Sequence, residues 1–166
     1  MLVVDIFSGT GAATQAFVDR GHKVIRIDNN PKLKPDIVAD VRHLPLRCKP
    51  DFVWASPPCQ LFSLARKGGG RADNWIDGLE LVVASCDAIA HLAPRYWVIE
   101  NVRGACAILG PGYRRFGSVF LWGRLPPFVD TAPHSKKMAA HNARDRARMP
   151  YSLSLALCLA LERDLA

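Results

Sequence analysis

The chain has 166 residues, of which 49% are hydrophobic and 22% charged, with a formal net charge of +7 and a pI of about 9.5. This size and composition are typical of one globular core, so residues 1–166 are interpreted as a single domain. The positive surplus favours an anionic partner such as nucleic acid over a neutral metabolite.

Several classes of protein are disfavoured at once. No window is long or apolar enough to cross a bilayer, and the opening apolar run, interrupted by Asp5, does not resemble a signal peptide. The five cysteines form no CxxC pair and no metal-ligand spacing with the five histidines. We therefore expect a soluble cytoplasmic protein with neither a bound metal nor a disulfide framework.

The first half of the chain alternates short apolar runs with polar turns. A strand is expected over residues 2–7, followed by the turn Ser8-Gly9-Thr10-Gly11 and a helix over 12–20. Further strands are expected over 23–27, 36–39 and 51–55. They finish on polar residues, respectively Asp28, Asp40 and the loop Ser56-Pro57-Pro58-Cys59.

The second half continues this alternation. A helix is expected over 75–93, strands over 96–99 and 119–122, a proline-rich loop over 126–135 and an apolar helix over 151–161. Strands that alternate with helices predict an α/β fold of the Rossmann-like kind, with a mostly parallel, doubly wound sheet. In such sheets ligands bind outside the carboxyl ends of the strands.

The first turn carries the pattern of a nucleotide-like site. Gly9 and Gly11 have no side chains, so a cofactor can approach the backbone closely. Asp28 follows about twenty residues later at the end of the second strand, where a carboxylate usually accepts hydrogen bonds from a ribose. The alternative for Asp28 is a turn former, because Asp28-Asn29-Asn30-Pro31 is also good turn chemistry.

Two strand ends carry candidate catalytic groups. Cys59 lies in a stiff, proline-bound loop after a buried strand, which suits a nucleophile. The alternative is a small buried hydrophobe, the interpretation given to Cys86 and Cys158. Glu100 emerges from an apolar strand, an environment that raises the pKa of a carboxyl group and lets it hold a proton. The alternative for Glu100 is an ion pair with an arginine.

These motifs together resemble the cytosine-C5 DNA methyltransferase family. The segments Asp5-Ile6-Phe7-Ser8-Gly9-Thr10-Gly11, Pro57-Pro58-Cys59-Gln60 and Glu100-Asn101-Val102 occur in the family's order and rough spacing. The resemblance covers roughly residues 1–123, and residues 150–161 look like the family's final helix. It implies a methyltransferase fold that uses S-adenosylmethionine and DNA, with the target cytosine flipped out of the duplex.

The resemblance also implies roles for individual residues. Cys59 would add to C6 of cytosine and Glu100 would act at N3, which activates C5 for methylation. Phe7 would stack on the adenine, Gly9 and Gly11 would shape the pocket, Asp28 would bind the ribose and Asp40 the adenine amino group. The complete cofactor set expected is Asp5, Phe7, Ser8, Gly9, Gly11, Asp28, Asn29, Asp40, Val41, Pro57 and Ser152. The complete substrate set expected is Ser56, Pro58, Gln60, Ser63, Asn101 and Arg103, with residues 61–74 as a loop that closes over the base.

The sequence departs from the family pattern in three places. The family's glutamine-x-arginine-x-arginine motif falls on Arg114, Phe116 and Ser118, so Arg114 or Arg115 is expected to reach the cytosine O2 or a phosphate. In the final helix Tyr151 replaces the usual asparagine. The family's target-recognition domain would lie between Gly123 and Pro150, where only about 26 residues are available, too few for a domain.

A chain without that domain is expected to recognise short or relaxed sequences through phosphate contacts, or to rely on a recognition subunit or a second copy of itself. Reduced relatives occur in viruses, where such an enzyme would protect DNA from restriction in the host cytoplasm. Two alternatives use the same residues: a cytosine-C5 methyltransferase of RNA or nucleotides, and an inactive module that binds cofactor or nucleic acid. An exocyclic amino methyltransferase is disfavoured because Cys59 stands where those enzymes place an aromatic residue.

Overall fold

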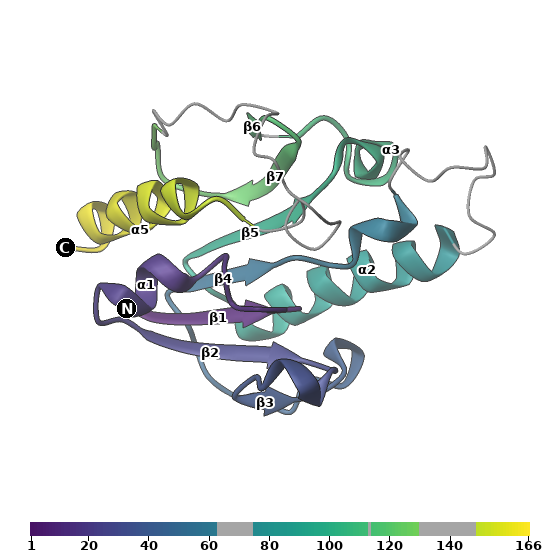
Figure 1. Cartoon of the computed structure of the whole chain (residues 1–166), viewed down its shortest axis with the longest axis horizontal. Coiled ribbons are helices and arrows are strands. Elements are labelled where there is room, and N and C mark those ends of the chain that lie inside the picture. The colour runs from purple at the N-terminus through teal and green to yellow at the C-terminus, as the bar shows by residue number, and fades with distance from the viewer. Residues whose placement is uncertain (63–74, 113, 130–148) are drawn as a thin grey trace.

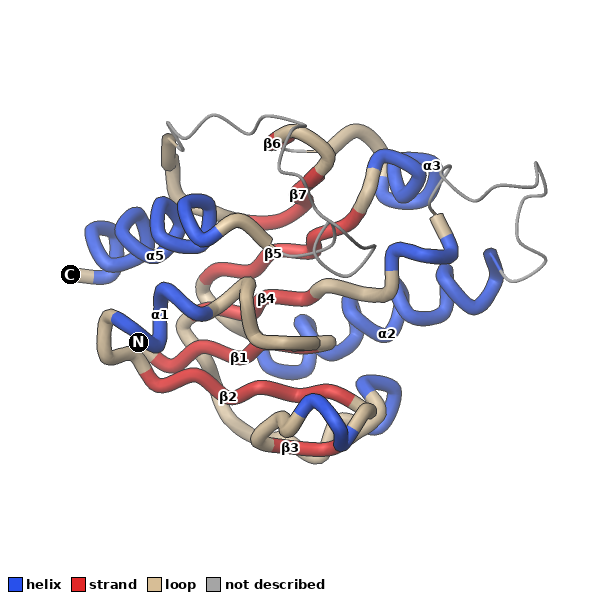
Figure 2. Tube along the Cα trace, viewed as in Figure 1, coloured by secondary structure: helices blue, strands red, loops and turns tan. Residues whose placement is uncertain are grey.

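A seven-stranded sheet forms the centre of the protein. The computed structural model describes residues 1–62, 75–112, 114–129 and 149–166. The strand order is β3-β2-β1-β4-β5-β7-β6 (Figure 2). The strands are β1 (Leu2–Ile6), β2 (Lys23–Asp28), β3 (Ile37–Val38), β4 (Phe52–Ala55), β5 (Tyr96–Asn101), β6 (Arg114–Phe116) and β7 (Val119–Arg124). The first five are parallel and β7 runs antiparallel to both of its neighbours, which confirms the predicted α/β class.

Helices cover both faces of the sheet. On one face lie α1 (Gln15–Asp19) and α5 (Tyr151–Leu165), and on the other lies α2 (Trp75–Leu92) (Figure 1). A short helix, α3 (Cys106–Leu109), follows β5. Single 3-10 turns occupy Pro31–Leu33, Val41–His43, Cys59–Leu61 and Arg103–Ala105. The arrangement is the doubly wound one that the alternation of elements predicts.

Alternation along β4 explains how two cores form. Phe52 and Trp54 point to the face of α1 and α5, whereas Val53 and Ala55 point to α2, and all four are fully buried. A strand buried on both faces is apolar at every position, as parallel central strands usually are. The residue after β4 therefore leaves the core at a fixed point of the carboxyl edge.

The last helix is attached to the first through a buried hydroxyl. Ser154 is fully buried, donates to the carbonyl oxygen of Ala13 at 2.7 Å and accepts from the Ala16 N–H at 3.4 Å. Nearer the end of α5, Glu162 forms a bidentate pair with Arg20 and contacts His22 Nε2 at 2.8 Å. The expected apolar helix over 151–161 is confirmed and continues to Leu165.

Most bounds differ from the expected ones by one or two residues, and three departures have a local cause. The helix expected over 12–20 begins at Gln15, because a hydrogen-bonded turn from Gly11 to Thr14 precedes it. The strand expected over 36–39 is only Ile37–Val38, and the Asp36 carboxylate accepts the backbone N–H of Arg26 at 2.8 Å. A strand over Arg114–Phe116 was not expected, since two adjacent arginines do not show the alternation of a half-buried strand.

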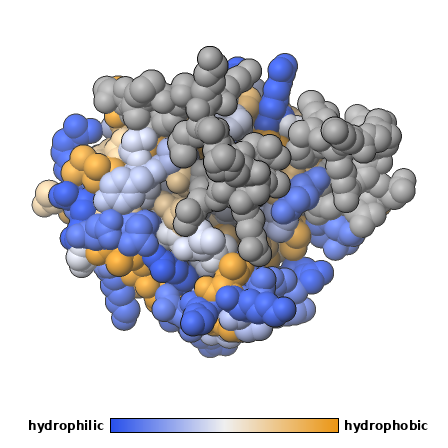
Figure 3. Space-filling model, viewed as in Figure 1, coloured by the Kyte–Doolittle hydropathy of each residue, from blue (hydrophilic) through white to orange (hydrophobic). Residues whose placement is uncertain are grey.

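The described surface carries both polar and apolar side chains. No helix in the described ranges is long and apolar enough to cross a membrane. Hydrophilic and hydrophobic side chains are mixed over the described part of the face in Figure 3. The apolar side chains that reach the surface include Tyr151 and Leu159 on α5, with 47% and 45% of their areas exposed.

Candidate active site

The turn after β1 has an unusual backbone. Phe7, Gly9 and Gly11 all have positive φ angles, of 59°, 54° and 75°. This conformation is costly for a bulky residue such as Phe7 and is found where a site requires it. Among the described residues, a Cβ on Gly9 would meet only the Phe7 carbonyl oxygen, at 4.0 Å, so within this part of the chain the space beside Gly9 is open.

At Gly11 a side chain is excluded by a neighbouring residue of the protein. A Cβ there would lie 2.5 Å from the guanidinium of Arg26, a side chain of β2 that also donates to Gln15 Oε1 at 3.1 Å. The missing side chain of Gly11 therefore makes room for Arg26 within the protein. This close approach helps to fix the shape of the turn after β1.

Asp28 is fixed at the carboxyl end of β2. Its Oδ2 accepts the N–H of Gly9 at 2.9 Å and its Oδ1 accepts the N–H of Asn30 at 2.9 Å. A carboxylate oxygen has room for a second hydrogen bond, so the half-buried group can still receive two hydroxyls. The turn role and the ribose role considered for Asp28 are thus compatible, because the turn holds the carboxylate beside the open side of Gly9.

Asp5 lies beneath this turn, fully buried. Burial raises the pKa of Asp5 to about 7, against the opposing effects of the Thr14 hydrogen bond and the charge of Arg26. Thr14 donates to Asp5 Oδ2 at 2.6 Å, while Asp5 Oδ1 and the buried hydroxyl of Ser8 have no hydrogen-bond partner in the described part of the chain. Unsatisfied buried polar atoms are uncommon, and both occur at the same turn.

Cys59 and Glu100 come together at the ends of adjacent strands. Cys59 follows β4, Glu100 lies near the end of β5, and β4 pairs with β5. Burial raises the pKa of the Cys59 thiol, and the negative charge of Glu100 raises it further. Burial also raises the pKa of Glu100 to about 7, so this carboxyl group holds a proton over a large part of the neutral range.

A hydrogen-bond relay orients the Glu100 carboxyl group. The indole N–H of Trp54 donates to Ser56 Oγ at 2.7 Å, so the Ser56 hydroxyl proton is available for its hydrogen bond to Glu100, which lowers the carboxyl pKa. When Glu100 is protonated, Ser56 contacts one carboxyl oxygen and the other is available to donate. Ser56 thus lies between the core and the acid.

Asn101 holds the loop that carries Cys59. Its side chain is fully buried, donates from Nδ2 to the Pro57 carbonyl oxygen at 2.9 Å and accepts the N–H of Val102 at 2.8 Å. Both ends of the amide are therefore engaged within the protein. This geometry points to positioning of the Pro57-Pro58-Cys59 loop rather than to a direct substrate contact.

Comparison with known proteins decides the family. Residues 1–107 match the model of the family described as C-5 cytosine-specific DNA methylase. The chain belongs to this family. It is 31% identical over 178 residues to the Probable DNA (cytosine-5)-methyltransferase of Frog virus 3, covering 87% of this chain and 80% of that protein.

Two bacterial relatives match a smaller share of the chain. The Type II methyltransferase M.AplI of Arthrospira platensis is 31% identical over 117 residues, which cover 63% of this chain and 32% of that enzyme. The Type II methyltransferase M.HindV of Haemophilus influenzae is 28% identical over 118 residues, covering 61% and 38%. This chain therefore spans only about a third of those two enzymes.

The two candidate arginines of the methylase point to opposite faces of β6. Arg114 pairs in register with Leu121 of β7, which in turn pairs with Glu100, so Arg114 and Glu100 share one face of the sheet at one level. Two strand spacings put their Cα atoms roughly 10 Å apart. Arg115 lies on the other face, where its guanidinium stacks on Phe120 at 5.4 Å.

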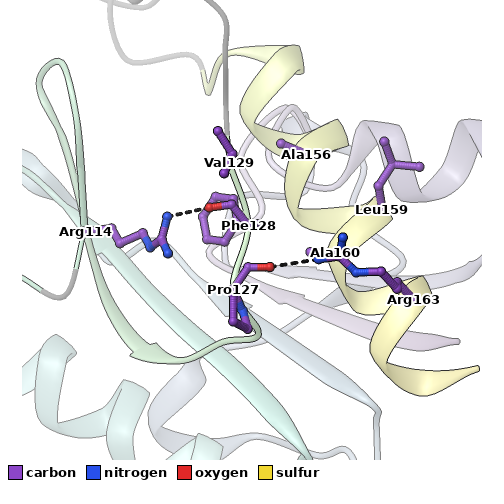
Figure 4. A pocket seen from close by; sticks show the side chains of 8 residues that line it. All are labelled: Arg114, Pro127, Phe128, Val129, Ala156, Leu159, Ala160 and Arg163. Carbon is purple, nitrogen blue, oxygen red and sulfur yellow. Dashed lines mark hydrogen bonds between the residues drawn. The ribbon is translucent and has the colours of Figure 1, made fainter.

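The Arg114 guanidinium lies over the ring of Phe128, 4.9 Å from its centroid, and donates to the Phe128 carbonyl oxygen. There it lines a hollow of about 400 Å³ between the chain after β7 and α5 (Figure 4). Arg163 of α5 donates to the Pro127 carbonyl oxygen on the opposite side of the hollow. A contact with the target base thus requires the Arg114 guanidinium to turn away from Phe128.

The other expected site residues occupy varied environments. Asp40 begins the turn Val41–His43, and the guanidinium of Arg42 lowers the pKa of its carboxyl group to about 2. Val41 is buried, Asn29, Gln60 and Arg103 are exposed, and Pro58 and Ser152 are half-buried. Ser63 and most of the loop expected over 61–74 lie outside the described residues.

Sequence reasoning missed three residues that shape the methylase site. Arg26 explains Gly11, Ser154 fixes α5 to α1, and Gly104 approaches the Cys59 segment closely. Of these three residues, only Ser154 could have been recognised from the sequence, because it is a polar residue between Leu153 and Leu157 on the buried side of an apolar helix.

A further cluster places ligand-type atoms of His22, Cys158 and Glu162 within 4.8 Å of one another. Arg20 pairs with both carboxylate oxygens of Glu162, so an ion-pair network accounts for the cluster.

Proposed function

We propose that this chain transfers a methyl group from S-adenosylmethionine to C5 of cytosine in DNA, through a covalent adduct between Cys59 and C6. The observation that carries the proposal is the meeting of Cys59 and Glu100 at the carboxyl edge, with a Glu100 pKa of about 7. A nucleophile and an acid on adjacent strand ends suit a substrate that needs both at once.

The proposed chemistry assigns one step to each group. Cys59 Sγ forms a bond to C6, while Glu100 donates its proton or a hydrogen bond to N3, so that electron density moves to C5. After C5 has been methylated, the C5 proton passes to solvent, the S–C6 bond breaks to release the Cys59 thiolate, and N3 returns its proton to Glu100, which restores the aromatic ring. The raised Cys59 pKa means that the thiol is mostly protonated before substrate binds, so its proton passes to solvent before the S–C6 bond forms.

The residues at the glycine turn fit S-adenosylmethionine, which supplies a methyl group on a positively charged sulfur. The open side of Gly9, the fixed carboxylate of Asp28 and the unpartnered hydroxyl of Ser8 offer a backbone approach, a ribose acceptor and a donor in one place. Phe7 would pack on the adenine, with Asp40 and Val41 at its edge. Asn29, Pro57 and Ser152 complete the proposed set, and Asp5 supports the turn from below.

For the substrate, the register favours Arg114 over Arg115 as the residue that reaches cytosine O2, because only Arg114 shares the face of Glu100. Ser56 and Asn101 act by orienting Glu100 and the Cys59 loop. Pro58, Gln60, Ser63 and Arg103 remain proposed contacts to the flipped nucleotide.

Recognition of the DNA sequence is proposed to be short or relaxed, because only about 26 residues separate Gly123 from Pro150, where the family's recognition domain would lie. Its positive charge would hold the phosphates, with a recognition subunit or a second copy of the chain as the further source of specificity. Protection of viral DNA from restriction in the host cytoplasm fits the resemblance to the Frog virus 3 protein.

The test is expression of the chain and of its Cys59→Ala variant in a host without cytosine methylation. DNA and RNA are digested separately to nucleosides, and 5-methylcytosine is quantified in each by mass spectrometry. We expect the mark in DNA and only with the intact thiol. A mark in RNA alone would move the substrate to RNA, and cofactor binding without any mark would support an inactive binding module.

A further inference from the structure

The segment that carries Cys59 is held on both sides by residues at the end of β5 and in the turn after it. Before Cys59, the Asn101 amide donates to the Pro57 carbonyl oxygen at 2.9 Å. After Cys59, the Phe62 peptide packs against Gly104, in the turn Arg103–Ala105. The Phe62 N–H in turn donates to the Cys59 carbonyl oxygen at 3.0 Å, so a displacement of Phe62 reaches the nucleophile through one hydrogen bond.

Gly104 makes this packing possible by lacking a side chain. A Cβ at this position would lie 1.9 Å from the Phe62 carbonyl oxygen and 2.9 Å from its carbonyl carbon. Real Cβ contacts are essentially never shorter than 3.0 Å, so the peptide would have to move by at least 1.1 Å. The obstacle is backbone, which cannot rotate out of the way as the end of a long side chain can.

Backbone conformation does not explain this glycine. Gly104 is absent from the glycines with positive φ, so its turn is open to other residues, and only the close approach to Phe62 requires it. Phe62 also has little room to move, because the residue is only 9% exposed and its side chain packs with Val82, Ala105 and Trp122. A Cβ at position 104 is therefore expected to displace the Phe62 peptide, and with it the backbone that leads back to Cys59.

We infer that Gly104 is a positioning residue for the nucleophile: by admitting the Phe62 peptide it fixes the place of Cys59 beside Glu100. The inference rests on the proposed function, in which the thiol must reach C6 of the base. A misplacement of about 1 Å at a reacting group can cost on the order of 100-fold in rate, because reaction requires near-contact geometry. Binding of the cofactor, at the glycine turn after β1, is not involved.

The experiment compares Gly104→Ala with a matched control, Gly21→Ala. Gly21 has a φ of 81° and open space around a Cβ, so alanine there strains the backbone without displacing any neighbour. Both variants are measured for kcat, for KM of the DNA, for affinity for S-adenosylmethionine, and for the rate of Cys59 alkylation by iodoacetamide against pH, followed by peptide mass spectrometry. Circular dichroism at 10 °C checks that each variant is folded.

For Gly104→Ala we expect a kcat lower by about 10- to 100-fold, with KM and cofactor affinity within about twofold, and a shifted pH profile of Cys59 alkylation. Gly21→Ala should keep the kcat and the alkylation profile of the unmodified chain. Equal kcat values and unchanged alkylation in both variants would overturn the inference. So would a Gly104→Ala chain that is unfolded at 10 °C, since the contact would then serve the fold rather than the thiol.

The alkylation arm separates this inference from the proposed function. If the unmodified chain transfers no methyl group, the proposed function fails, yet the pH profile of Cys59 still shows whether Gly104 fixes the thiol. Asn101→Ser provides a second variant on the other side of Cys59, and it should shift the same profile because it removes the hydrogen bond to Pro57.

Discussion

Replacing Glu100 by glutamine should stabilise the fold at pH 8 while abolishing methyl transfer. Burial raises the Glu100 pKa from 4.5 to about 7, so between these values the native protein holds a proton that the unfolded chain has released. Stability therefore falls as pH rises through this window, and the loss is complete above about pH 7. Glutamine removes the loss because it has no charge to bury.

The size of the effect follows from the same shift. Each pKa unit corresponds to about 1.4 kcal/mol, so the full shift sets an upper limit of about 3.4 kcal/mol. Glu100 keeps some contact with solvent, which reduces the expected gain to about 1 to 3 kcal/mol. The hydrogen bond from Ser56 can be kept, because the glutamine side chain retains an acceptor oxygen.

Urea unfolding of both chains at pH 4.5 and pH 8 measures this prediction. The stability difference should be small at pH 4.5 and reach its full value at pH 8, and the raised pKa of Asp5 cancels because both chains carry it. Glu80→Gln, which removes an exposed carboxylate of α2, is unfolded under the same conditions as a control for the loss of one negative charge outside the site. A difference that is the same at both pH values, or a variant less stable at pH 8, would refute the burial argument.

Three further changes test the other parts of the site. Asp28→Ala should weaken binding of S-adenosylmethionine by tenfold or more in calorimetry, because a charged acceptor is lost, and unchanged affinity would remove Asp28 from the pocket. Ser154→Ala should lower the free energy of unfolding by about 1 to 3 kcal/mol, since it leaves buried backbone groups unpaired, whereas Ser152→Ala should have little effect. Arg20 lowers the pKa of Glu162, so this pair stabilises the fold above about pH 4.5 and the contribution is lost as pH falls below it. Glu162→Gln should accordingly flatten the acid side of the stability curve, and an unaltered acid side would contradict the assignment.

The sequence predicts the strands of this fold better than its contacts. β4 and β5 are apolar runs that lead into polar residues, so their places and their functional ends follow from hydrophobicity, whereas β1 is recognised from its apolar run and the Ser8-Gly9 turn after it. β6 gives no such signal, because Arg114 and Arg115 become a strand only through pairing with β7. What the sequence does offer is local: Gly117 and Ser118 form a two-residue loop between Phe116 and Val119, and Gly117 has a φ of 61°, as in a β-hairpin.

The residues of the candidate site likewise include some that the sequence predicts and others that only the structure explains. Cys59, Glu100 and Asp28 can be found from their positions after strands, together with the resemblance to a family. The reasons for Gly11 and Gly104 cannot, because each depends on one neighbour, Arg26 or the Phe62 peptide, that only the folded chain brings within a few ångströms. The choice between Arg114 and Arg115 likewise needed the strand register.

Because α5 packs on α1 and comes last in the chain, one face of the sheet cannot be covered until synthesis is almost finished. The face of the sheet that carries Phe52 and Trp54 is closed by Leu153 and Leu157, which are made about 100 residues later than Trp54. A ribosome adding about 5 to 20 residues per second leaves this apolar face open for several seconds in every new chain. Synthesis therefore exposes half of the future core, and a chaperone that binds apolar segments has its best opportunity before α5 emerges.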